Sequence, residues 1–509
     1  MLEVVEGDVR GVVAEQPEVQ PSVRVLTPDG VALPGVEVSW TPAGGDGSAT
    51  EATITDASGA AVAEWVLGER AGTQRITARL QNGAHVTVEA VAHPGAVVEI
   101  VGPSTLMIGV GEQLPAPIHM ADAFGNVVPR SRAIWSIEST LVASVDEDGL
   151  MSGIAPGSTV LGVDVDGLTE EFPVEVGQSL RLTQIAAGLS HACGLTEAGD
   201  AFCWGSNSNG ELGAGDVESG NQAIRVDGPE PWRAISLGDR VSCAVSISER
   251  GYCWGRRSHS LLGDGVLSPD LNIPESISLD DPIRSLDAGP HHTQCAITTG
   301  DEAYCWGHND FGQVGLGFES SRVLTPQLLP VDGAVRETAL SAFHGCALMR
   351  SGSTWCWGGG EGLGREVEDP LMASAPAPVA GDREFATLAR GIFSTCGVTA
   401  TGPSFCWGRR GHMHVFAPGT GSLREPTAVG DLDLETLAVG DFHACATLVS
   451  GGATCWDSDS LPGPSPLADA VRFAASWLFT CALDGKGTPY CWGDGYGPTP
   501  IRIFKRNLN

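Results

Sequence analysis

Fourteen cysteines in seven equally spaced pairs constrain the fold of this chain more than any other feature. In every pair nine residues separate the two cysteines, and the second cysteine usually begins a Cys-Trp-Gly triplet. Successive second cysteines lie about 50 residues apart, and only the last interval shortens to 36. A period of this length indicates an array of similar structural units. The pairs are Cys193 and Cys203, Cys243 and Cys253, Cys295 and Cys305, Cys346 and Cys356, Cys396 and Cys406, Cys445 and Cys455, and Cys481 and Cys491.

Two cysteines ten positions apart come close together only if the chain turns back between them. In the first pair, a hairpin loop at 197–199 would place Cys193 directly opposite Cys203. The last loop position then needs a positive φ, as in a type I turn followed by a G1 bulge. Glu249 and Asp301 occupy this position in two repeats, and glycine occupies it in the other five: Gly199, Gly352, Gly402, Gly451 and Gly487. We therefore predict seven hairpin disulfides, placed at non-hydrogen-bonded pairs of the two strands.

Zinc ligation and free buried thiols are the alternatives to disulfides. Zinc sites favour two to four residues between cysteines, whereas nine separate them here, so we expect no metal. An even count with one uniform spacing favours disulfides, which persist in oxidising compartments. The chain is therefore expected to be secreted, periplasmic or displayed on a cell surface.

The start, Met1-Leu-Glu-Val-Val-Glu-Gly, has no signal-peptide pattern, so we expect a leader to be missing. No apolar run is long enough to span a membrane.

The apolar pattern predicts an all-β protein. Apolar residues come in short alternating runs between Gly, Pro, Asp and Asn, with 68 glycines and 32 prolines in 509 residues. Residues 1–95 show strands every 8–12 residues, which is typical of an immunoglobulin-like β-sandwich. Residues 96–177 repeat this theme. From about 181 to 505, four short strands per repeat predict the blades of a β-propeller. Seven repeats predict seven blades.

Three resemblances support this division. The segments Pro34-Gly-Val-x-Val-x-Trp40 and Thr55-Asp-x-x-Gly-x-Ala61 resemble bacterial Ig-like group 1 domains. Trp135-Ser136 followed by Gly153-Ile-Ala-Pro-Gly157 resembles the group 2 domains. The first repeat carries Ala187-Gly-x-x-His191-x-Cys, then Trp204-Gly-x-Asn-x-x-Gly-x-Leu-Gly213. This resembles the repeat of the regulator-of-chromosome-condensation family, whose members close with seven blades. Repeats five to seven lose most of the Asn-x-x-Gly-x-Leu-Gly segment.

Several recurrent residues are interpreted as scaffold. The aromatic residue before the second cysteine and the Trp after it share one strand face in six repeats, a pattern that predicts packing between blades. His191, His344 and His443 each precede a first cysteine by two residues, so one shared structural role is more economical than three active sites. The acidic run 146–148 lacks the ligand spacing of an EF-hand and is interpreted as a solvated turn.

The net charge of −33 argues against a nucleic-acid partner. No nucleophile elbow, HExxH or phosphate-binding glycine loop is present, so no catalytic residue and no cofactor is assigned. The predicted function is non-catalytic recognition of an extracellular protein or a glycan by propeller loops of a monomer, with the Ig-like domains as a stalk. The alternatives are a secreted lyase or glycosidase with its site at the propeller channel, and an inhibitor of a secreted hydrolase.

Two local basic clusters at one rim are candidate binding residues: Arg256, Arg257 and His259, and Arg409, Arg410, His412 and His414.

Overall fold

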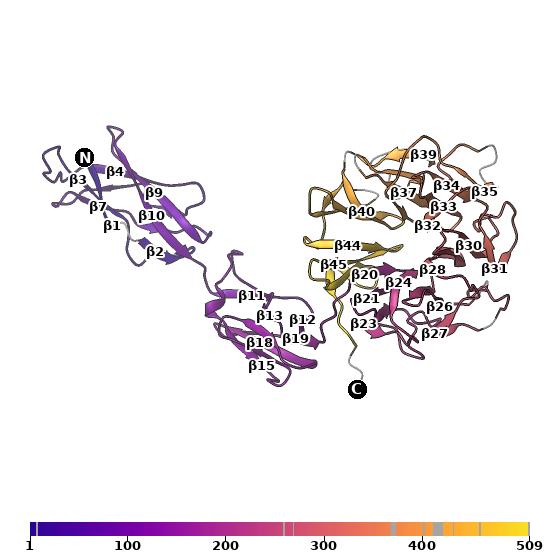
Figure 1. Ribbon diagram of the computed structural model, residues 1–509. Coiled ribbons are helices and arrows are strands. Elements are labelled where there is room, and N and C mark those ends of the chain that lie inside the picture. The colour runs from indigo at the N-terminus through magenta and orange to yellow at the C-terminus, as the bar shows by residue number, and fades with distance from the viewer. Residues whose placement is uncertain are drawn as a thin grey trace. The chain divides into compact units, whose positions relative to one another are not determined.

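The computed structural model confirms the all-β class. It describes residues 1–6, 9–257, 260–267, 269–367, 373–400, 403–410, 421–430, 432–457 and 460–506. Over these ranges the chain forms β-strands and two single-turn 3₁₀ helices, η1 and η2, and neither helix is long or apolar enough to cross a membrane. The chain divides into two compact units, Met1–Gly177 and Gln178–Asn509 (Figure 1). His259, His412, His414 and Gly402 lie outside the described residues.

The first sandwich of the N-terminal unit packs two antiparallel-rich sheets against each other. The alternation predicted from Val38, Trp40, Ile76 and Ala78 is observed, since all four side chains are buried in one core. The three-stranded sheet is β1 (Leu2–Glu6), β3 (Ser22–Val25) and β7 (Ala60–Val62); the five-stranded sheet is β2 (Val9–Val12), β10 (His85–His93), β9 (Gly72–Arg79), β4 (Glu37–Pro42) and β6 (Ala52–Ile54); β5 (Ser48–Ala49) pairs with β8 (Trp65–Val66).

The second sandwich has its own core, built around Met120, Leu161 and Val174. In the acidic turn, Asp146 accepts hydrogen bonds from the backbone N–H groups of Asp148 and Leu150, which is the geometry of a self-contained Asx turn. The sheets are β12 (Leu106–Gly109), β19 (Leu168–Gly177), β18 (Gly157–Val165) and β15 (Ile134–Ile137); β13 (Gln113–Pro115), β17 (Leu150–Gly153) and β16 (Ala143–Val145); and β11 (Val97–Val101) with β14 (His119–Asp122), while η1 spans Arg130–Arg132. The kinship of both sandwiches with bacterial Ig-like groups stays a prediction.

The C-terminal unit is a seven-bladed propeller of four-stranded antiparallel sheets, as predicted (Figure 1). In each blade the strands pair in chain order, and the first strands of successive blades contact one another around the centre. The blades are β20 (Gln184–Ala187), β21 (His191–Leu195), β22 (Ala201–Gly205), β23 (Gly220–Arg225); β24 (Trp232–Leu237), β25 (Val241–Ser246), β26 (Gly251–Gly255), β27 (Leu271–Ser276); β28 (Ile283–Ala288), β29 (Thr293–Thr298), β30 (Ala303–His308), β31 (Arg322–Leu328), with η2 (Pro290–His292); β32 (Val335–Leu340), β33 (His344–Met349), β34 (Thr354–Gly358), β35 (Ala373–Pro378); β36 (Thr387–Arg390), β37 (Ser394–Val398), β38 (Phe405–Arg409), β39 (Ser422–Ala428); β40 (Leu434–Val439), β41 (His443–Leu448), β42 (Ala453–Asp457), β43 (Gly463–Pro464); and β44 (Ala470–Ala475), β45 (Phe479–Asp484), β46 (Pro489–Gly493), β47 (Gly497–Arg502).

All seven predicted disulfides form, one in each blade, between the second and third strands. In blade one the two cysteines pair directly in the strand register, and their Cα atoms are 4.0 Å apart. This close approach is typical of the non-hydrogen-bonded positions of an antiparallel pair. The described residues include no free cysteine. The bonds join Cys193 to Cys203, Cys243 to Cys253, Cys295 to Cys305, Cys346 to Cys356, Cys396 to Cys406, Cys445 to Cys455, and Cys481 to Cys491.

The hairpin turns also have the predicted geometry. Gly199 has φ 82°, and the backbone N–H of Gly199 donates to the Thr196 carbonyl while that of Thr196 donates to the Asp200 carbonyl. The two exceptions to glycine, Glu249 and Asp301, have φ 64° and 66°. Each of these carboxylates forms an ion pair with an inner-strand arginine, Glu249 with Arg233 and Asp301 with Arg284. A side chain at this strained position therefore links the hairpin turn to the inner strands.

The ring closes without exchange of a strand, because all four strands of blade seven come from one continuous segment. The C-terminal segment 503–506 instead runs beside β23, the outer strand of blade one. The Ala223 N–H donates to the Phe504 carbonyl, and the Arg506 N–H donates to the Ala223 carbonyl. On the other side of the junction, the Leu182 N–H donates to the Gly487 carbonyl of blade seven. Both ends of the propeller segment thus join blade one to blade seven.

The predicted aromatic packing is confirmed for the tryptophans that follow the second cysteines. Five of them, Trp204, Trp254, Trp306, Trp357 and Trp407, are fully buried. The aromatic residue before the cysteine is less enclosed: Phe202 is buried, whereas Tyr252, Tyr304 and Trp355 are half-buried. The indoles therefore form the contact between blades, and the preceding aromatics lie on the same side nearer the surface.

Candidate functional site

One face of the propeller is formed by two sets of loops, those between the first and second strands and those between the third and fourth strands. Their proximity follows from the strand register, because Gly205 at the end of β22 lies opposite His191 at the start of β21. Backbone hydrogen bonds then join the loops: Ser206 N–H donates to the Ser190 carbonyl, and Arg409 N–H donates to the Phe393 carbonyl. The loops between the first and second strands surround the mouth of the central channel on this face, which we call the channel-mouth face.

Exposed and half-buried aromatic side chains gather on the channel-mouth face. Phe311 and Phe343 meet edge-to-face with centroids 4.8 Å apart, and Phe343 stacks on Phe393 at 5.5 Å. Phe442 and Trp477 lie in the corresponding loops between the first and second strands of blades six and seven, where their exposed fractions are 43% and 39%. We call these five residues the aromatic patch. Apolar surface that stays exposed in a contiguous area is typical of interaction sites, and aromatic residues are enriched at protein interfaces.

The residue patterns did not lead us to predict the aromatic patch, although the sequence contains a signal for it. The position just before the second strand is occupied by Ser190, Arg240 and His292 in blades one to three. In blades four to seven the same position is Phe343, Phe393, Phe442 and Leu478. Aligning the repeats on their cysteines would have shown large apolar residues at a turn position that carries polar residues elsewhere.

Below the aromatic patch, an arginine from blade five crosses the central channel. Arg390 donates hydrogen bonds to the carbonyls of Leu237, at 2.6 Å, and Ala288, at 2.7 Å, in blades two and three. It also lies 3.3 Å from the Asp287 carboxylate. A small cavity of about 50 Å³ remains at the mouth, lined by Arg390, Asp239, Trp477 and turn residues of several blades.

Two carboxylates converge in the channel wall. Asp287 accepts hydrogen bonds from the Leu340 N–H and the Ser236 hydroxyl, and its burial raises its pKa. Glu337 accepts hydrogen bonds from the Thr387 hydroxyl at 3.0 Å, and burial raises the pKa of Glu337 to about 7. These contacts join neighbouring inner strands, so both carboxylates bind groups of the channel wall. In the part of the chain that the structure describes, no group of three Asp, Glu, His or Cys side chains is placed to hold a metal ion.

The predicted basic clusters begin loops on the channel-mouth face but do not come together. Arg257 forms an ion pair with Asp264 and is largely buried. Arg409 lies over the Phe393 ring, with its guanidinium carbon 5.0 Å from the ring centroid, so it adjoins the aromatic patch. Blades three and four separate Arg256 and Arg257 from Arg409 and Arg410. A single basic site across both clusters is therefore not formed by these arginines.

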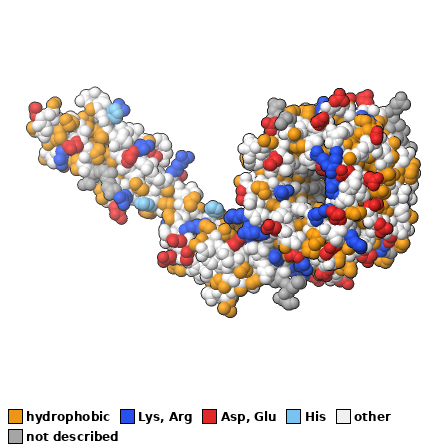
Figure 2. Space-filling view, in the orientation of Figure 1, with side chains coloured by type: hydrophobic (Ala, Val, Ile, Leu, Met, Phe, Trp, Pro, Cys, Tyr) orange, Lys and Arg blue, Asp and Glu red, His pale blue; other side chains and the backbone are white. Residues whose placement is uncertain are grey.

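Figure 2 shows Lys and Arg side chains near the middle of the propeller. The inner strands carry five arginines, one each on blades two, three, four, five and seven, and several of these bind the neighbouring inner strand. Arg233 donates to the Ile283 carbonyl, and Arg284 donates to the Val335 carbonyl. Arg233, Arg284 and Arg390 thus join blades around the channel. The five inner-strand arginines are Arg233, Arg284, Arg336, Arg390 and Arg472.

Comparison with known proteins covers the propeller. Models of the regulator of chromosome condensation (RCC1) repeat match residues 182–211 and 283–313, and 198–245 and 301–348. The C-terminal unit therefore contains RCC1-type repeats within its propeller. Among curated proteins, the chain is 30% identical to the ultraviolet-B receptor UVR8 of Arabidopsis thaliana over 221 residues, which cover 42% of this chain and 50% of UVR8.

A second relative and two solved structures agree with this assignment. The mitochondrial RCC1 domain-containing protein RUG3 of Arabidopsis thaliana is 27% identical over 262 residues, 48% of this chain and 57% of RUG3. The chain thus spans about half the length of these curated relatives. Prp20p of Saccharomyces cerevisiae superposes with TM-score 0.54 at 19% identity, covering 62% of this chain and 87% of Prp20p. Human WBSCR16 gives 0.53 at 16%, covering 60% and 94%. These structures share the fold.

The segments that match the RCC1 repeat contain its asparagine, and the structure shows what this residue does. In blade one, the Asn207 side chain accepts a hydrogen bond from the Leu212 N–H and donates to the Val217 carbonyl. In blade three, Asn309 makes the same two contacts with Val314 and Phe318. Each asparagine therefore holds the loop between the third and fourth strands in a compact turn.

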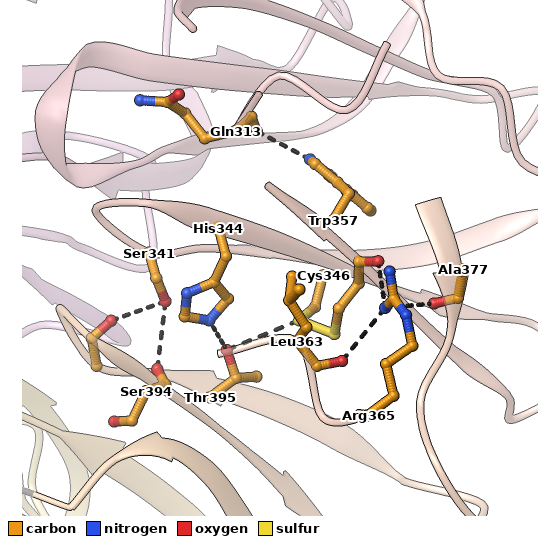
Figure 3. The surroundings of a disulfide bond; sticks show 12 residues. Gln313, Ser341, His344, Cys346, Trp357, Leu363, Arg365, Ala377, Ser394 and Thr395 are labelled. Atoms are coloured by element: carbon orange, nitrogen blue, oxygen red, sulfur yellow. Dashed lines mark hydrogen bonds between the residues drawn. A yellow bond between two sulfur atoms is a disulfide. The ribbon is translucent and has the colours of Figure 1, made fainter. Parts of the chain in front are cut away.

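The three repeat histidines have one structural role, as predicted. Each imidazole Nε2 lies within hydrogen-bond distance of a hydroxyl in the next blade. The distances are 2.9 Å for His191 to Ser242, 2.9 Å for His344 to Thr395 and 2.8 Å for His443 to Thr480. Figure 3 shows the second contact beside the blade-four disulfide. Burial lowers the pKa of His191 to about 3 and that of His344 to about 4, so both rings are neutral at physiological pH.

A serine or threonine partner stands just before the first cysteine only in blades whose preceding blade carries the repeat histidine. Ser242, Thr395 and Thr480 each stand one residue before a first cysteine, in the blades that follow His191, His344 and His443. The other four blades have alanine, glutamine or glycine at this position, and the blade before each of them lacks the histidine. The residue pattern thus specifies three interblade hydrogen bonds between named pairs of blades.

Proposed function

We propose that this chain is a non-catalytic recognition protein that binds a protein partner through the channel-mouth face of its propeller. The observation that carries this proposal is the aromatic patch. Phe311, Phe343 and Phe393 pack on one another and the Trp477 indole donates to the Asp441 carboxylate, so binding costs little ordering of these side chains. Arg409 beside Phe393 adds a cation at the edge of the patch. Aromatic and arginine side chains supply much of the energy of protein interfaces.

The relatives support recognition without defining a partner. UVR8 is described as a receptor, and one solved structure shows Kap60 bound to yeast RCC1 (Prp20). Seven disulfides support an oxidising compartment for the present chain, because thiols stay reduced in the cytosol. In this proposal the protein is secreted or lies on a cell surface, and the two N-terminal sandwiches act as a stalk.

Charge-introducing substitutions in the aromatic patch test the proposal. Purified full-length protein carrying Phe343→Asp or Phe442→Asp would be compared with wild type for capture of proteins from the secreted and surface-exposed fraction of the source cells. Val449→Asp is the matched control, since Val449 is an apolar residue, 66% exposed, at the hairpin turn on the opposite face. A partner retained by wild type and Val449→Asp but lost from the patch variants supports the proposal. Equal capture by all four proteins contradicts it.

A further inference from the structure

Blade six lacks most of the loop that covers the next blade elsewhere in the propeller. In blades one to three, residues 206–219, 256–270 and 309–321 connect the third and fourth strands. In blade six the same connection is 458–462, and the fourth strand β43 has only two residues, Gly463–Pro464. The shortened last cysteine interval in the sequence reflects this loss.

The long loops have a specific contact in the complete blades. In blade one, the Glu211 carbonyl accepts a hydrogen bond of 2.8 Å from the Trp254 indole Nε1–H of blade two. Gly213 lies so close to that indole that a Cβ added to it would be 2.6 Å from Nε1. Blade three repeats the contact on blade four, where the Gln313 carbonyl accepts from Trp357 at 2.8 Å (Figure 3). A short loop turn thus rests on the indole of the following blade, and a backbone carbonyl of the turn accepts the hydrogen bond of the indole N–H.

At the matching place between blades six and seven, the structure has a cavity of about 540 Å³, which we call the blade-six cavity. It is lined by Trp492, Phe479, Leu478, Leu461 and Pro464, among others. Trp492 is the repeat tryptophan of blade seven, and at 9% it is more exposed than Trp254 or Trp357, which are both fully buried. No hydrogen bond from Trp492 Nε1 is formed with any residue that the structure describes. The volume is within the range of ligand-binding pockets.

Blade seven also has a short connection, and a second cavity of about 550 Å³ lies beside it, lined by Asp494, Gly495 and Tyr496 together with loop residues of blade one. The third and fourth strands of blade seven are joined by 494–496 alone, yet Trp204 of blade one is fully buried. The Trp204 Nε1–H donates to Cys491 Sγ at 3.4 Å, and Tyr496 lies against Phe479 with ring centroids 5.3 Å apart. Trp204 does not line the cavity beside blade seven, whereas Trp492 lines the blade-six cavity, so of these two junctions the one at blade six places a repeat tryptophan in the cavity wall.

Charge indicates the kind of partner that fits this space. Of the described residues lining the blade-six cavity, Asp457 is the one with an acidic side chain, and none is a lysine or an arginine. The lining histidine, His443, is neutral because burial lowers its pKa. The chain as a whole carries a net charge of −33. A cationic segment is therefore favoured at the cavity entrance, and the apolar floor favours an aliphatic side chain.

We propose that the blade-six cavity binds an apolar turn of a partner protein, with a leucine followed by glycine and flanked by lysine or arginine. In the bound state the leucine packs on Trp492 and Leu478, and a backbone carbonyl of the partner accepts the hydrogen bond of Trp492 Nε1. The partner thus supplies the contact that Glu211, Leu212 and Gly213 supply between blades one and two. This inference rests on the proposed function, because it identifies the partner chemistry recognised by the same face.

A peptide probe tests the inference directly. The probe is a fluorescent cyclic peptide that carries the blade-one turn Gly-Glu-Leu-Gly between pairs of lysines, and its binding to the full-length protein is followed by fluorescence anisotropy. We expect saturable binding that weakens as NaCl is raised from about 50 to 300 mM, since exposed charges are screened. A probe with aspartate in place of leucine should bind at least about tenfold more weakly, because its charge would be buried on apolar surface.

Matched protein variants locate the binding. Leu461→Arg and Leu478→Arg change exposed cavity residues and should weaken the leucine peptide by about tenfold or more, through lost apolar contact and repulsion of lysine. Val449→Arg, in blade six on the opposite face, should bind like wild type. Absence of peptide binding to wild type, or unchanged binding by both cavity variants, overturns the inference. Phe343→Asp separates the two proposals, because it disrupts the aromatic patch while leaving the cavity intact.

Discussion

Blades one to four and blades five to seven are built from the same repeat but hold together differently. Most of the buried residues of blades one to four form one continuous apolar cluster that runs from Cys193 to Trp357. The buried residues of blades five to seven fall into smaller separate clusters. The indole hydrogen bonds follow the same division, since Trp254, Trp306 and Trp357 each donate to the loop of the preceding blade. The Trp407 indole N–H is buried without a partner among the described residues.

This difference shows which parts of the repeat make a blade and which parts join blades. Blade six keeps its disulfide and its inner strand although its outer strand has two residues. The hairpin and the inner-strand contacts are therefore sufficient to place a blade in the ring. The long loop and its asparagine add contact with the following blade, and a repeat that loses them exposes apolar surface. The exposed surface lies on the same face as the aromatic patch, where both are available to a partner.

The largest expected effect compares two tryptophans at the same repeat position. Trp254→Ala should lower the free energy of unfolding by about 3–5 kcal/mol, because it removes a fully buried indole together with the hydrogen bond that the indole donates to the Glu211 carbonyl. Trp492→Ala should cost at least about 1 kcal/mol less, since no loop hydrogen bond is lost. Denaturant unfolding with amide hydrogen exchange of the two blades measures both. Equal decreases in unfolding free energy for the two variants would show that the loop hydrogen bonds do not stabilise the contact between blades.

A second comparison uses the interblade histidines at acid pH. The folded pKa of His344, about 4, lies below the ordinary 6.5, so the unfolded chain binds its proton first as the pH falls. The contribution of the neutral His344 ring to the free energy of unfolding is therefore fully present above pH 6.5 and is lost as the pH falls from 6.5 to about 4. At pH 4.5 the loss should be about 2–3 kcal/mol per buried histidine.

Single substitutions assign this acid sensitivity to blades. His344→Gln should remove more of the difference in unfolding free energy between about pH 7 and pH 4.5 than His443→Gln, because His443 is less enclosed. His85→Gln, at an exposed site in the first sandwich, is the control and should leave the pH dependence unchanged. A His344→Gln protein with the same acid sensitivity as wild type would refute the assignment.

The smallest expected effect is the order in which the disulfides open. Cys455 is half-buried and lines the blade-six cavity, whereas both cysteines of the blade-two disulfide are fully buried. Thiol–disulfide exchange requires access to a sulfur atom. Under limiting reductant, Cys445–Cys455 should open first, about tenfold faster than Cys243–Cys253. Alkylation followed by peptide mapping gives the order, and simultaneous opening of the two pairs would contradict the difference in access.

Local patterns predicted most of the fold. The cysteine spacing and the glycine at the turn predicted the hairpin register of the blades, because a hairpin loop determines which residues are opposite. The turn also explains Glu249 and Asp301, whose positive φ was expected although neither is glycine. The partners of these two carboxylates were not predicted, although Arg233 and Arg284 lie on the first strands of the same blades as Glu249 and Asp301.

The candidate site was predicted less completely. The residues singled out for charge, Arg256, Arg257, Arg409 and Arg410, lie on one face but on blades two and five. Side chains from Phe311 to Trp477 make the aromatic patch, although more than 160 positions separate these two residues in the chain. Whether an apolar side chain is exposed depends on the residues that pack over it, and in a propeller these residues belong to other blades.

The sequence by itself determined the class, the repeat, the disulfide pairing and the shared role of three histidines, because each follows from spacings within about fifty residues. Only the tertiary structure decided the closure of the ring by 503–506, the arginine across the channel and the cavity over Trp492. Each of these depends on contacts between blades, where Arg390 reaches carbonyls more than a hundred residues away. Short-range periodicity specifies each blade, whereas the binding face exists only when seven blades surround one axis.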